Sequence, residues 1–405
     1  MDNTEIEKKP YGNLTVWNKQ FTLTFAANVL LCFSQHTVNT LISTYASYLG
    51  AGAVTIGMVS GLYFGVSAAA RPFSGPIISK LDQRKIMIWI YALGVLTGLV
   101  YAFSGDIAMF ITARVMHGIE FAFVGSLNLT LASNSLPREK LGTGIGIFGL
   151  GAAVATAIGP SMGIAIFRWA QELWGSDTGY MVVFLVSAGF MLLGLIPVFL
   201  LDPCKPGKKA LEQMGAWYKN IISVKTLIPA GLMLLVSASS ILFSTYMVPY
   251  ADSKGIENIG LFFTVYAVVL LVSRPLCGKL IDKIGVGRLY CPGAIVYLLS
   301  FLIVALGNSL PAMLVAAVFA AVGFGTLNPA IITLCMRSVP HAKRGVASNT
   351  QYFGIDIGFF LGPVMGGFVN AYLGYSSMYI IGAVPVALSG VLFMATWRSL
   401  KNRLY

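Results

Sequence analysis

The sequence predicts an all-α membrane protein with twelve transmembrane helices in two pseudo-symmetric six-helix bundles. Three observations lead to this fold class. Of the 405 residues, 57% are hydrophobic and only 10% are charged, whereas a soluble domain carries about 25% charged residues. The chain also divides into apolar segments long enough to cross a bilayer. Finally, a pattern of Gly, Pro and Arg residues recurs at a constant offset of 203 residues, as in Arg71 and Arg274.

The apolar segments define the expected helices in order. A membrane-spanning helix needs about 20 mainly apolar residues. The first six segments are 20–49, 53–80, 86–104, 106–134, 141–168 and 179–201. The second six are 226–252, 257–280, 289–308, 310–336, 345–373 and 376–398.

A polar stretch separates the two sets of segments. It runs from Asp202 to Lys225 and is rich in Lys, Pro and Gly. The sequence therefore predicts an N-terminal bundle at 1–201, a cytoplasmic linker at 202–225 and a C-terminal bundle at 226–405. We expect a short surface helix in the linker, around Ala210 to Tyr218.

The repeat is carried by residues that shape the backbone. Two motifs recur: Arg71-Pro72-x-x-Gly75 as Arg274-Pro275-x-x-Gly278, and Gly159-Pro160-x-x-Gly163 as Gly362-Pro363-x-x-Gly366. Gly and Pro fix unusual backbone geometry, so their coincidence at one offset indicates a duplicated unit. Pro160 and Pro363 should bend equivalent helices, and the glycines allow close helix packing. The paired arginines are interpreted as a repeated structural device.

Orientation follows from the basic residues, because Lys and Arg are enriched in cytoplasmic loops. The two termini and the five loops at 80–85, 138–140, 205–225, 279–288 and 337–344 hold 22 of the 27 Lys and Arg residues. The other five loops hold only Arg168 and Lys254. The sequence therefore predicts a multi-pass protein of the cell membrane with both termini in the cytoplasm.

Several functional classes find no support in the sequence. The net charge of +12 reflects the bias between loops, so we expect no nucleic-acid partner. The five cysteines show no CxxC spacing and no ligand pattern with the three histidines, so neither a metal site nor a cofactor is expected. No Gly-x-x-x-x-Gly-Lys-Ser/Thr loop for nucleotides is present.

Loop and helix motifs resemble those of the major facilitator superfamily. The loop from Gly278 through Asp282 to Arg288 follows that family's pattern G-x-x-x-D-[RK]-x-G-[RK]-[RK], whereas Ser79 stands where the first copy should have Asp, and Asp82 where it should have Gly. If the acidic side chain of this motif acts as a latch, we expect the latch of the first half to be weaker or differently formed.

Two helix motifs extend the resemblance. Arg114, His117 and Gly118 are similar to the family element R-x-x-[QH]-G, and Gly159-Pro160-x-x-Gly163 is similar to an element of exporters. The chain thus resembles the twelve-helix drug/metabolite efflux branch, of the arabinose efflux permease type. The resemblance implies two six-helix halves and secondary transport.

Ionisable residues deep in a bilayer cost about 2.5 to 3.5 kcal/mol on insertion scales, so they are functional candidates. Glu120 and Asp356 are the two acids placed near mid-membrane by their positions in the fourth and eleventh segments. His36 lies in a polar run of the first segment. We predict that these three residues are the candidates for proton coupling. A structural acid, or a buried histidine with satisfied hydrogen bonds, is the alternative at each position.

The candidates for substrate binding are polar and aromatic residues of the segments expected to face a central cavity. They are Arg114, Gln35, His36, Asn39, Tyr45, Tyr63, Glu120, Tyr246, Tyr266, Asn328, Tyr352 and Asp356. Residues expected to gate the pathway or shape the helices are Arg71, Gly75, Asp82, Gly159, Pro160, Arg274, Gly278, Asp282, Gly362 and Pro363.

The sequence favours a secondary transporter that works by alternating access and functions as a monomer in the lipid bilayer. The leading hypothesis is proton-coupled antiport that exports a small amphipathic organic compound. One alternative is uptake or exchange of an organic anion bound by Arg114. A non-transporting receptor or membrane enzyme is a more remote alternative, since no catalytic constellation is visible and the chain is expected not to be an enzyme.

Overall fold

The computed structural model describes residues 15–39, 41–51, 53–205 and 221–401, and every regular element in these ranges is a helix. We call residues 15–205 the first half and residues 221–401 the second half. The first half contains α1 (Lys19–Asn39), α2 (Ile42–Tyr48), α3 (Ala53–Lys80), α4 (Gln83–Ala102), α5 (Ile107–Ser135), η1 (Arg138–Lys140), α6 (Leu141–Phe148), α7 (Leu150–Trp174) and α8 (Ser176–Leu200). The second half contains η3 (Val224–Thr226), α10 (Leu227–Ser253), α11 (Gly260–Ile284), α12 (Val286–Leu306), α13 (Leu310–Arg337), η4 (His341–Lys343), α14 (Arg344–Gly382) and α15 (Val384–Lys401).

The helices correspond to the expected segments in order. Within the described ranges, nine stretches are long and apolar enough to cross a bilayer. One of them, His341–Lys401, contains the last two expected segments. The chain turns between these two segments at Gly374, where a φ of 78° interrupts the helical backbone of α14. The first two segments correspond to α1 with α2, and to α3. The all-α membrane fold is confirmed, whereas most of the expected linker lies outside the described residues, with its helix at 210–218.

One expected segment differs in two details from the helices observed. The fifth segment is broken into α6 and α7 at Gly149. Its second part continues to Trp174 rather than ending at Arg168. The last turns of α7 contain Gln171 and Glu172 next to exposed Trp169 and Trp174, so this part is amphipathic and a purely apolar criterion ends too early.

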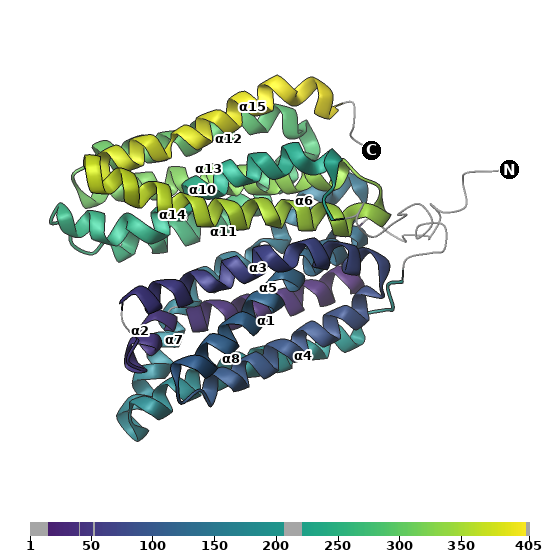
Figure 1. Cartoon of the computed structure of the whole chain (residues 1–405). Helices are drawn as coiled ribbons and strands as arrows, with labels where there is room; N and C mark the ends of the chain where they lie inside the picture. Colours follow the sequence, from purple (N-terminus) through teal and green to yellow (C-terminus); the bar gives the residue numbers. More distant parts are fainter. Residues whose placement is uncertain (1–14, 40, 52, 206–220, 402–405) are drawn as a thin grey trace.

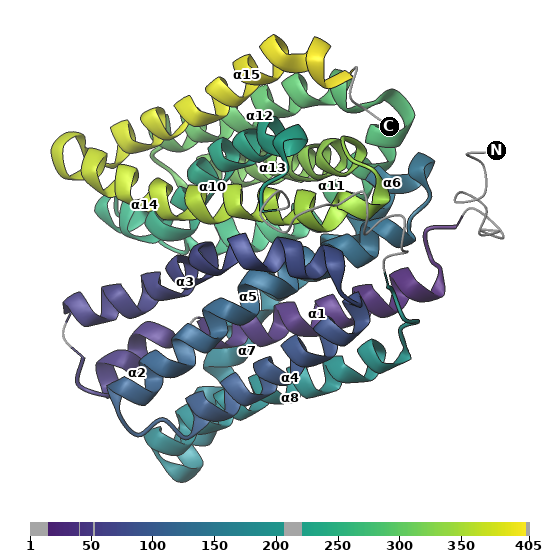
Figure 2. The ribbon, with the colours of Figure 1, turned by 45° about the vertical axis from the view of Figure 1, so that its right-hand side comes forward.

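The two halves lie side by side as bundles of roughly parallel helices (Figures 1 and 2). The first helix begins and the last helix ends at the same end of the molecule, which we call the terminal end (Figure 1). The opposite end, where α10 ends at Ser253 and α11 begins at Gly260, is called the far end. Two main helix contacts join the halves, α3 with α14 and the α6–α7 helix with α11, and α5 also packs against α14. The repeat offset of 203 residues relates these two pairs to each other.

Each half has its own buried apolar core. In the first half, one cluster surrounds Tyr91 and Met191. In the second half, a larger cluster includes Phe243, Tyr297 and Phe301. Large apolar side chains also cover the outside: Trp89 is 76% exposed and Phe368 is 67% exposed. Such an apolar exterior fits contact with lipid rather than with water.

Candidate functional site

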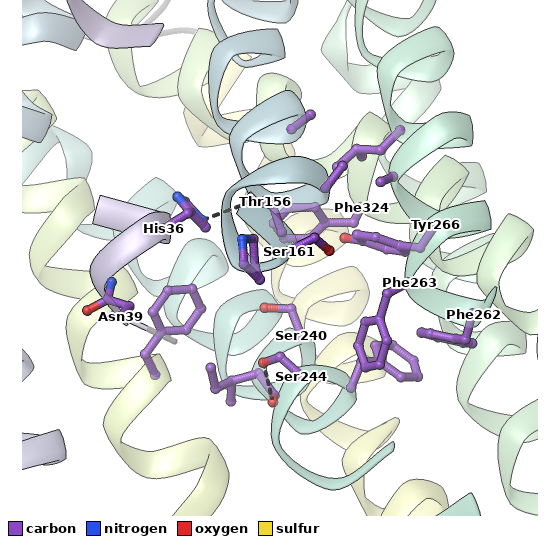
Figure 3. Close-up of a pocket in the computed structure, with 18 of the residues that line it drawn as sticks. His36, Asn39, Thr156, Ser161, Ser240, Ser244, Phe262, Phe263, Tyr266 and Phe324 are labelled. Atoms are coloured by element: carbon purple, nitrogen blue, oxygen red, sulfur yellow. Dashed lines mark hydrogen bonds between the residues drawn. The ribbon is translucent and has the colours of Figure 1, made fainter. Parts of the chain in front are cut away.

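A cavity of about 900 Å³ lies between the two halves. Its wall is formed by α1, α2, α3, α5 and α7 from the first half and by α10, α11, α13 and α14 from the second. The close-up in Figure 3 labels His36, Asn39, Thr156, Ser161, Ser240, Ser244, Phe262, Phe263, Tyr266 and Phe324. Because both halves contribute, a relative movement of the halves would change the shape of this cavity.

The cavity belongs to the far end of the bundle. It takes the last turns of α1, at His36 and Asn39, and the first turns of α11, from Gly260 to Leu270. One turn beyond Leu270, Arg274 is already buried. Toward the terminal end the halves are therefore in direct contact, and the cavity has a floor.

His36 fixes one polar side of the cavity wall. Its Nδ1 atom lies 2.8 Å from the carbonyl oxygen of Cys32, which can only accept a hydrogen bond, so Nδ1 carries a proton. Its Nε2 atom lies 3.0 Å from the hydroxyl group of Thr156 on α7 (Figure 3). The imidazole ring thus connects α1 to α7.

Arg114 supplies a cationic group to the cavity wall and is itself held by the first half. Its Nε donates to the carbonyl oxygen of Val59 at 3.1 Å, and one terminal nitrogen donates to Asn39 Oδ1 at 3.2 Å. The guanidinium carbon lies 4.8 Å from the centre of the Tyr63 ring, a cation–π distance. Tyr63 and His117 are also in contact, with ring centroids 4.7 Å apart.

The remaining cavity wall is aromatic and hydroxylic. Phe64, Phe262, Phe263, Tyr266 and Phe324 contribute rings. Serine hydroxyl groups from α7 and α10 point into the same space (Figure 3). Among the described residues that line the cavity, none is Asp or Glu. The fixed charge of the described wall is therefore positive, and the wall suits an amphipathic organic molecule.

Glu120 does not line this cavity. It is 3% exposed and packs inside the first half, where a Cβ atom added to Gly94 of α4 would lie 3.0 Å from Glu120 Oε2. Met191 of α8 borders the same point. No ion pair involves Glu120 within the described part of the chain. Its carboxyl group is thus a deep acid without a charged partner, away from the cavity.

Asp356 lies below the cavity in an ion pair that joins the halves. Arg71 Nε on α3 lies 2.8 Å from Asp356 Oδ2 on α14, and the two side chains are 1% and 0% exposed. Ser67 donates to the same carboxylate oxygen at 3.0 Å. The guanidinium group also lies over the Tyr352 ring, 4.9 Å from its centre. Asp356 was expected to contact substrate or a proton, and Arg71 to contact a neighbouring helix; the structure brings the two together.

A ring of neutral hydrogen bonds surrounds the ion pair. Asn349 of α14 donates to the carbonyl oxygen of Arg71 at 2.6 Å and accepts from Ser74 at 2.7 Å. The hydroxyl groups of Thr130 on α5 and Ser348 on α14 are 2.7 Å apart across the interface. The contact of α14 with α3 and α5 at the terminal end is therefore polar and contains one buried charge pair.

The second contact between the halves is built on Asp282, just inside the end of α11. Its carboxylate accepts from the backbone N–H groups of Gly142 at 2.9 Å and Thr143 at 2.7 Å, at the start of α6. Arg337 Nη2 lies 3.0 Å from the same carboxylate. An acid is well placed at a helix N-terminus because the N–H groups there lack partners.

The equivalent position in the first half carries Ser79 and forms a weaker contact. Ser79 lies beside Gly345 at the start of α14, but its buried hydroxyl group has no hydrogen bond in the described part of the chain. Asp82, which was grouped with the gating and structural residues, caps α4 by accepting from Arg84 N–H at 3.1 Å. The two positions therefore differ in their contacts: Asp282 binds the start of α6, whereas the Ser79 hydroxyl group binds no described residue.

The motif glycines and prolines lie at close helix contacts. A Cβ atom on Gly75 would approach Asn349 at 2.9 Å, and one on Gly278 would meet Gly142 O at 2.5 Å. A Cβ on Gly159 would meet His36, and one on Gly362 would meet the carbonyl group of Ala238. Pro160 lines the cavity. The Pro363 carbonyl accepts a hydrogen bond from Tyr246 at 2.8 Å.

Of the twelve substrate candidates, five line the cavity: Arg114, His36, Asn39, Tyr63 and Tyr266. The other seven lie outside its lining: Gln35, Tyr45, Glu120, Tyr246, Asn328, Tyr352 and Asp356. Tyr45 is buried in the first half and donates to the Ser104 carbonyl group. The amide nitrogen of Gln35 is buried without a partner in the described part of the chain, and Asn328 faces Met233.

Several cavity residues were not singled out by the sequence. They are the hydroxyl groups of Thr156, Ser161, Ser240 and Ser244 and the rings of Phe262 and Phe263. Only Thr156 could have been noticed in the sequence, because it lies one turn before Pro160 of the repeated Gly-Pro motif. Serine in an apolar helix is otherwise too common to indicate a binding site.

Comparisons with known proteins agree with this architecture. The chain is 26% identical over 406 residues to the multidrug resistance protein MdtG of Salmonella schwarzengrund, covering 96% of each chain. It is 25% identical over 374 residues to the staphylopine export protein of Staphylococcus aureus, covering 88% of this chain and 89% of that protein. Among solved structures, FucP in the outward conformation superimposes with a TM-score of 0.76 at 14% identity, covering 92% of this chain and 97% of FucP.

The sequence model described as Major Facilitator Superfamily matches residues 24–258 and 230–403. These two matches together span nearly the whole chain. Members of this family are membrane transporters rather than enzymes, and the relatives named above are of the efflux type. The chain therefore belongs to the major facilitator superfamily.

Proposed function

We propose that this chain is a proton-driven antiporter of the cell membrane that exports small amphipathic organic compounds. The observation that carries the proposal is the buried Arg71–Asp356 ion pair, which joins the two halves directly below the cavity. An acid in such a place can link proton binding to opening of the interface. The names of the relatives, a multidrug resistance protein and an export protein, favour export.

The direction of opening follows if both termini are cytoplasmic, as the distribution of Lys and Arg predicts. The terminal end, where the halves are in contact, is then the cytoplasmic side, and the cavity at the far end faces outward. We propose that residues 1–201 and 226–405 are the two moving units, connected by the linker at 202–225, and that one copy of the chain is sufficient for transport.

We propose that a proton reaches Asp356 from the cavity by passing two aromatic rings. Phe64 and Phe359 line the cavity with ring centroids 5.8 Å apart. Each lies one helical turn from a member of the site below: Phe64 from Ser67, and Phe359 from Asp356. A proton that passes these rings from outside neutralises Asp356 and removes the attraction to Arg71.

This arrangement gives antiport in the required order. In the outward-facing form, cargo leaves and Asp356 takes up a proton. Loss of the ion pair then loosens the α3–α14 contact and allows the cytoplasmic side to open. Asp356 releases its proton to the cytoplasm, new cargo binds, and re-formation of the ion pair with Arg71 returns the transporter to the outward-facing form.

The proposal is tested by measuring the opening of the terminal end as a function of pH. Spin labels at Leu81→Cys and His341→Cys, two exposed positions beyond α3 and before α14, report their separation in a background without native cysteines. We expect the separation to increase on acidification in lipid nanodiscs. Asp356→Asn should give the longer separation at both pH values, and Glu120→Gln should retain the pH response. An unchanged pH response in Asp356→Asn would contradict the assignment.

Transport itself is tested in proteoliposomes with an acidic lumen. A pH gradient in this direction should drive uptake of an amphipathic compound in exchange for protons. Uptake should fail in Asp356→Asn, and the Glu120→Gln variant decides whether the second deep acid contributes. Gradient-independent uptake that is equal in wild type and Asp356→Asn would exclude proton antiport through this residue.

Exchange of an organic anion is the second candidate, favoured by Arg114 in a cavity wall whose described residues include no acid. Exchange would persist as counterflow without a pH gradient and would be lost in Arg114→Ala. Counterflow that survives in Arg114→Ala would eliminate this residue as the binding charge.

A further inference from the structure

The repeat allows the surroundings of Arg71 and Arg274 to be compared position by position. Arg71 is neutralised by Asp356, and its Nε donates to the carboxylate. In the other copy, the position of Asp356 is taken by Ala153, 203 residues earlier. The partner Ser67 is replaced by Leu270, and Tyr352 is replaced by Gly149. The site around Arg274 therefore contains the cation of the Arg71 site but not its acid.

Arg274 is buried and contacts a backbone carbonyl group where Arg71 contacts a carboxylate. One terminal nitrogen donates to the carbonyl group of Gly149 on the α6–α7 break. A side chain at position 149 would collide with the guanidinium group of Arg274, so this group fits only because residue 149 is glycine. Arg274 is 7% exposed and forms no ion pair with any residue that the structure describes.

The unpaired atom of Arg274 is the same atom that binds the acid in the other copy. Arg274 Nε is buried and has no hydrogen-bond partner in the described part of the chain. Arg71 Nε is the atom 2.8 Å from Asp356 Oδ2. A buried donor attached to a full charge is costly when it is left unpaired. The second copy thus presents an anion-binding group without its anion.

The missing carboxylate would lie next to the cavity. Ala153 and Leu270, which replace Asp356 and Ser67, both line the cavity and pack against each other in its floor. Arg274 follows Leu270 by one helical turn, directly beneath that floor. An anion entering from the cavity would pass the small Ala153 side chain while the Leu270 side chain turns aside.

We propose that Arg274 forms the anion-binding subsite of the cavity and that the cargo is an aromatic monocarboxylate whose carboxylate occupies the place that Asp356 takes in the other copy. The aromatic body of the cargo would lie against Tyr266 and Phe324, which line the cavity and pack against the cluster of Ala153 and Leu270. Arg114 then serves as a fixed part of the first half rather than as the main anion ligand. This inference rests on the proposed transport function and adds its substrate class.

Binding of three matched probes tests the subsite at equilibrium and without a gradient. 2-Naphthoate, 2-naphthamide and 2-naphthylmethylamine share one ring system and differ in charge at neutral pH. We expect naphthoate to bind purified wild-type protein more tightly than the neutral and cationic probes. Arg274→Gln should weaken naphthoate roughly 10- to 100-fold, as expected for loss of a charge-assisted hydrogen bond, and leave naphthamide unchanged. Equal binding of all three probes, or no binding of any, would overturn the proposal.

A second test compares two substitutions at position 153 by naphthoate binding and by thermal unfolding. Ala153→Asp should restore an internal ion pair with Arg274 and exclude naphthoate, whereas the isosteric Ala153→Asn should not. Ala153→Asp should also have the higher unfolding temperature of the two, and the difference should disappear in an Arg274→Gln background. If Ala153→Asp and Ala153→Asn behave alike in both measurements, position 153 does not face the guanidinium group and the subsite is refuted.

These tests separate the subsite from the transport proposal. Naphthoate binding that depends on Arg274, together with absent gradient-driven transport, would refute antiport and support the subsite. Gradient-driven transport that is abolished by Asp356→Asn, together with naphthoate binding that is unchanged in Arg274→Gln, would do the reverse.

Discussion

At the scale of single residues, two deep acids that look alike in the sequence have different surroundings. Asp356 is paired with Arg71 across the interface between the halves, whereas Glu120 packs against Gly94 and Met191 inside the first half. Removing one member of a buried ion pair leaves the other charge without a partner, and this costs about 3 to 5 kcal/mol. The same loss does not apply to Glu120.

This difference predicts the stability of charge variants. Asp356→Asn and Arg71→Gln should each lower the free energy of unfolding by about 3 to 5 kcal/mol, and the double variant should lose less than the sum of the two. Glu120→Gln should cost little or increase stability. Unfolding of the detergent-solubilised protein, followed by circular dichroism, provides the measurement. Additive losses in the double variant would show that the pair does not act as a unit.

At the scale of helices, stability depends on which glycines lie at a helix contact. Gly358 of α14 packs on α10, where an added Cβ would lie 2.6 Å from Leu234 O, which is too close. Gly189 of α8 has no atom within 4 Å of an added Cβ. Both glycines lie inside long apolar helices and differ in the space around an added Cβ atom, so Gly189 serves as the control for Gly358.

Alanine at these glycines should have opposite effects. Gly358→Ala should separate α14 from α10 and lower the unfolding temperature. Gly189→Ala should be neutral or stabilise by up to about 1 kcal/mol, since alanine favours the helix. Thermal unfolding of both variants is sufficient as a measurement. A Gly358→Ala variant as stable as Gly189→Ala would contradict the close contact.

The two latches give a second prediction for helix ends. Asp282→Asn should weaken the cap on α6 and the contact with Arg337, and so increase the population open at the terminal end. Ser79→Ala should have no effect, because the Ser79 hydroxyl group has no hydrogen bond in the described residues. The distance between spin labels at positions 81 and 341 reports both. Equal shifts in the two variants would argue against an asymmetric latch.

At the scale of the whole molecule, the cavity predicts which residues can be reached from outside. Ser161 is exposed in the cavity, whereas Ser348 is fully buried at the interface of the terminal end. In a background without native cysteines, Ser161→Cys should react with a membrane-impermeant thiol reagent added to whole cells. Ser348→Cys should not react under these conditions. Reaction of Ser348→Cys without reaction of Ser161→Cys would contradict the proposed orientation.

Much of the fold could be predicted from the sequence, because it depends on composition and on local residues. Apolar length identified the helices, and Gly159 and Gly362 marked equivalent helix contacts. The ion pair could not be predicted: Arg71 and Asp356 are 285 residues apart and come from different copies of the repeat. Each was recognised as unusual, but only packing of α3 on α14 brings them together.

The candidate site was predicted less completely for a related reason. Tyr63 and Tyr266 were chosen because their segments were expected to face a central cavity, and both line the cavity. Tyr45 and Tyr246 were chosen by the same criterion, but their hydroxyl groups bind backbone carbonyl groups away from the cavity lining. A helix position alone does not state which side of the helix faces the cavity.

The unequal latches imply an order of events when the transporter changes state. Once Asp356 is neutral, the hydrogen bonds of Asn349 with Ser74 and with the Arg71 carbonyl group join uncharged groups, and Ser79 contributes no acid to this contact. The α6–α11 contact still holds Asp282 and Arg337 together. The halves should therefore separate first along α3 and α14 while the α6–α11 contact stays closed. The movement is then a rotation about a hinge at one edge of the interface rather than a uniform separation of the two halves.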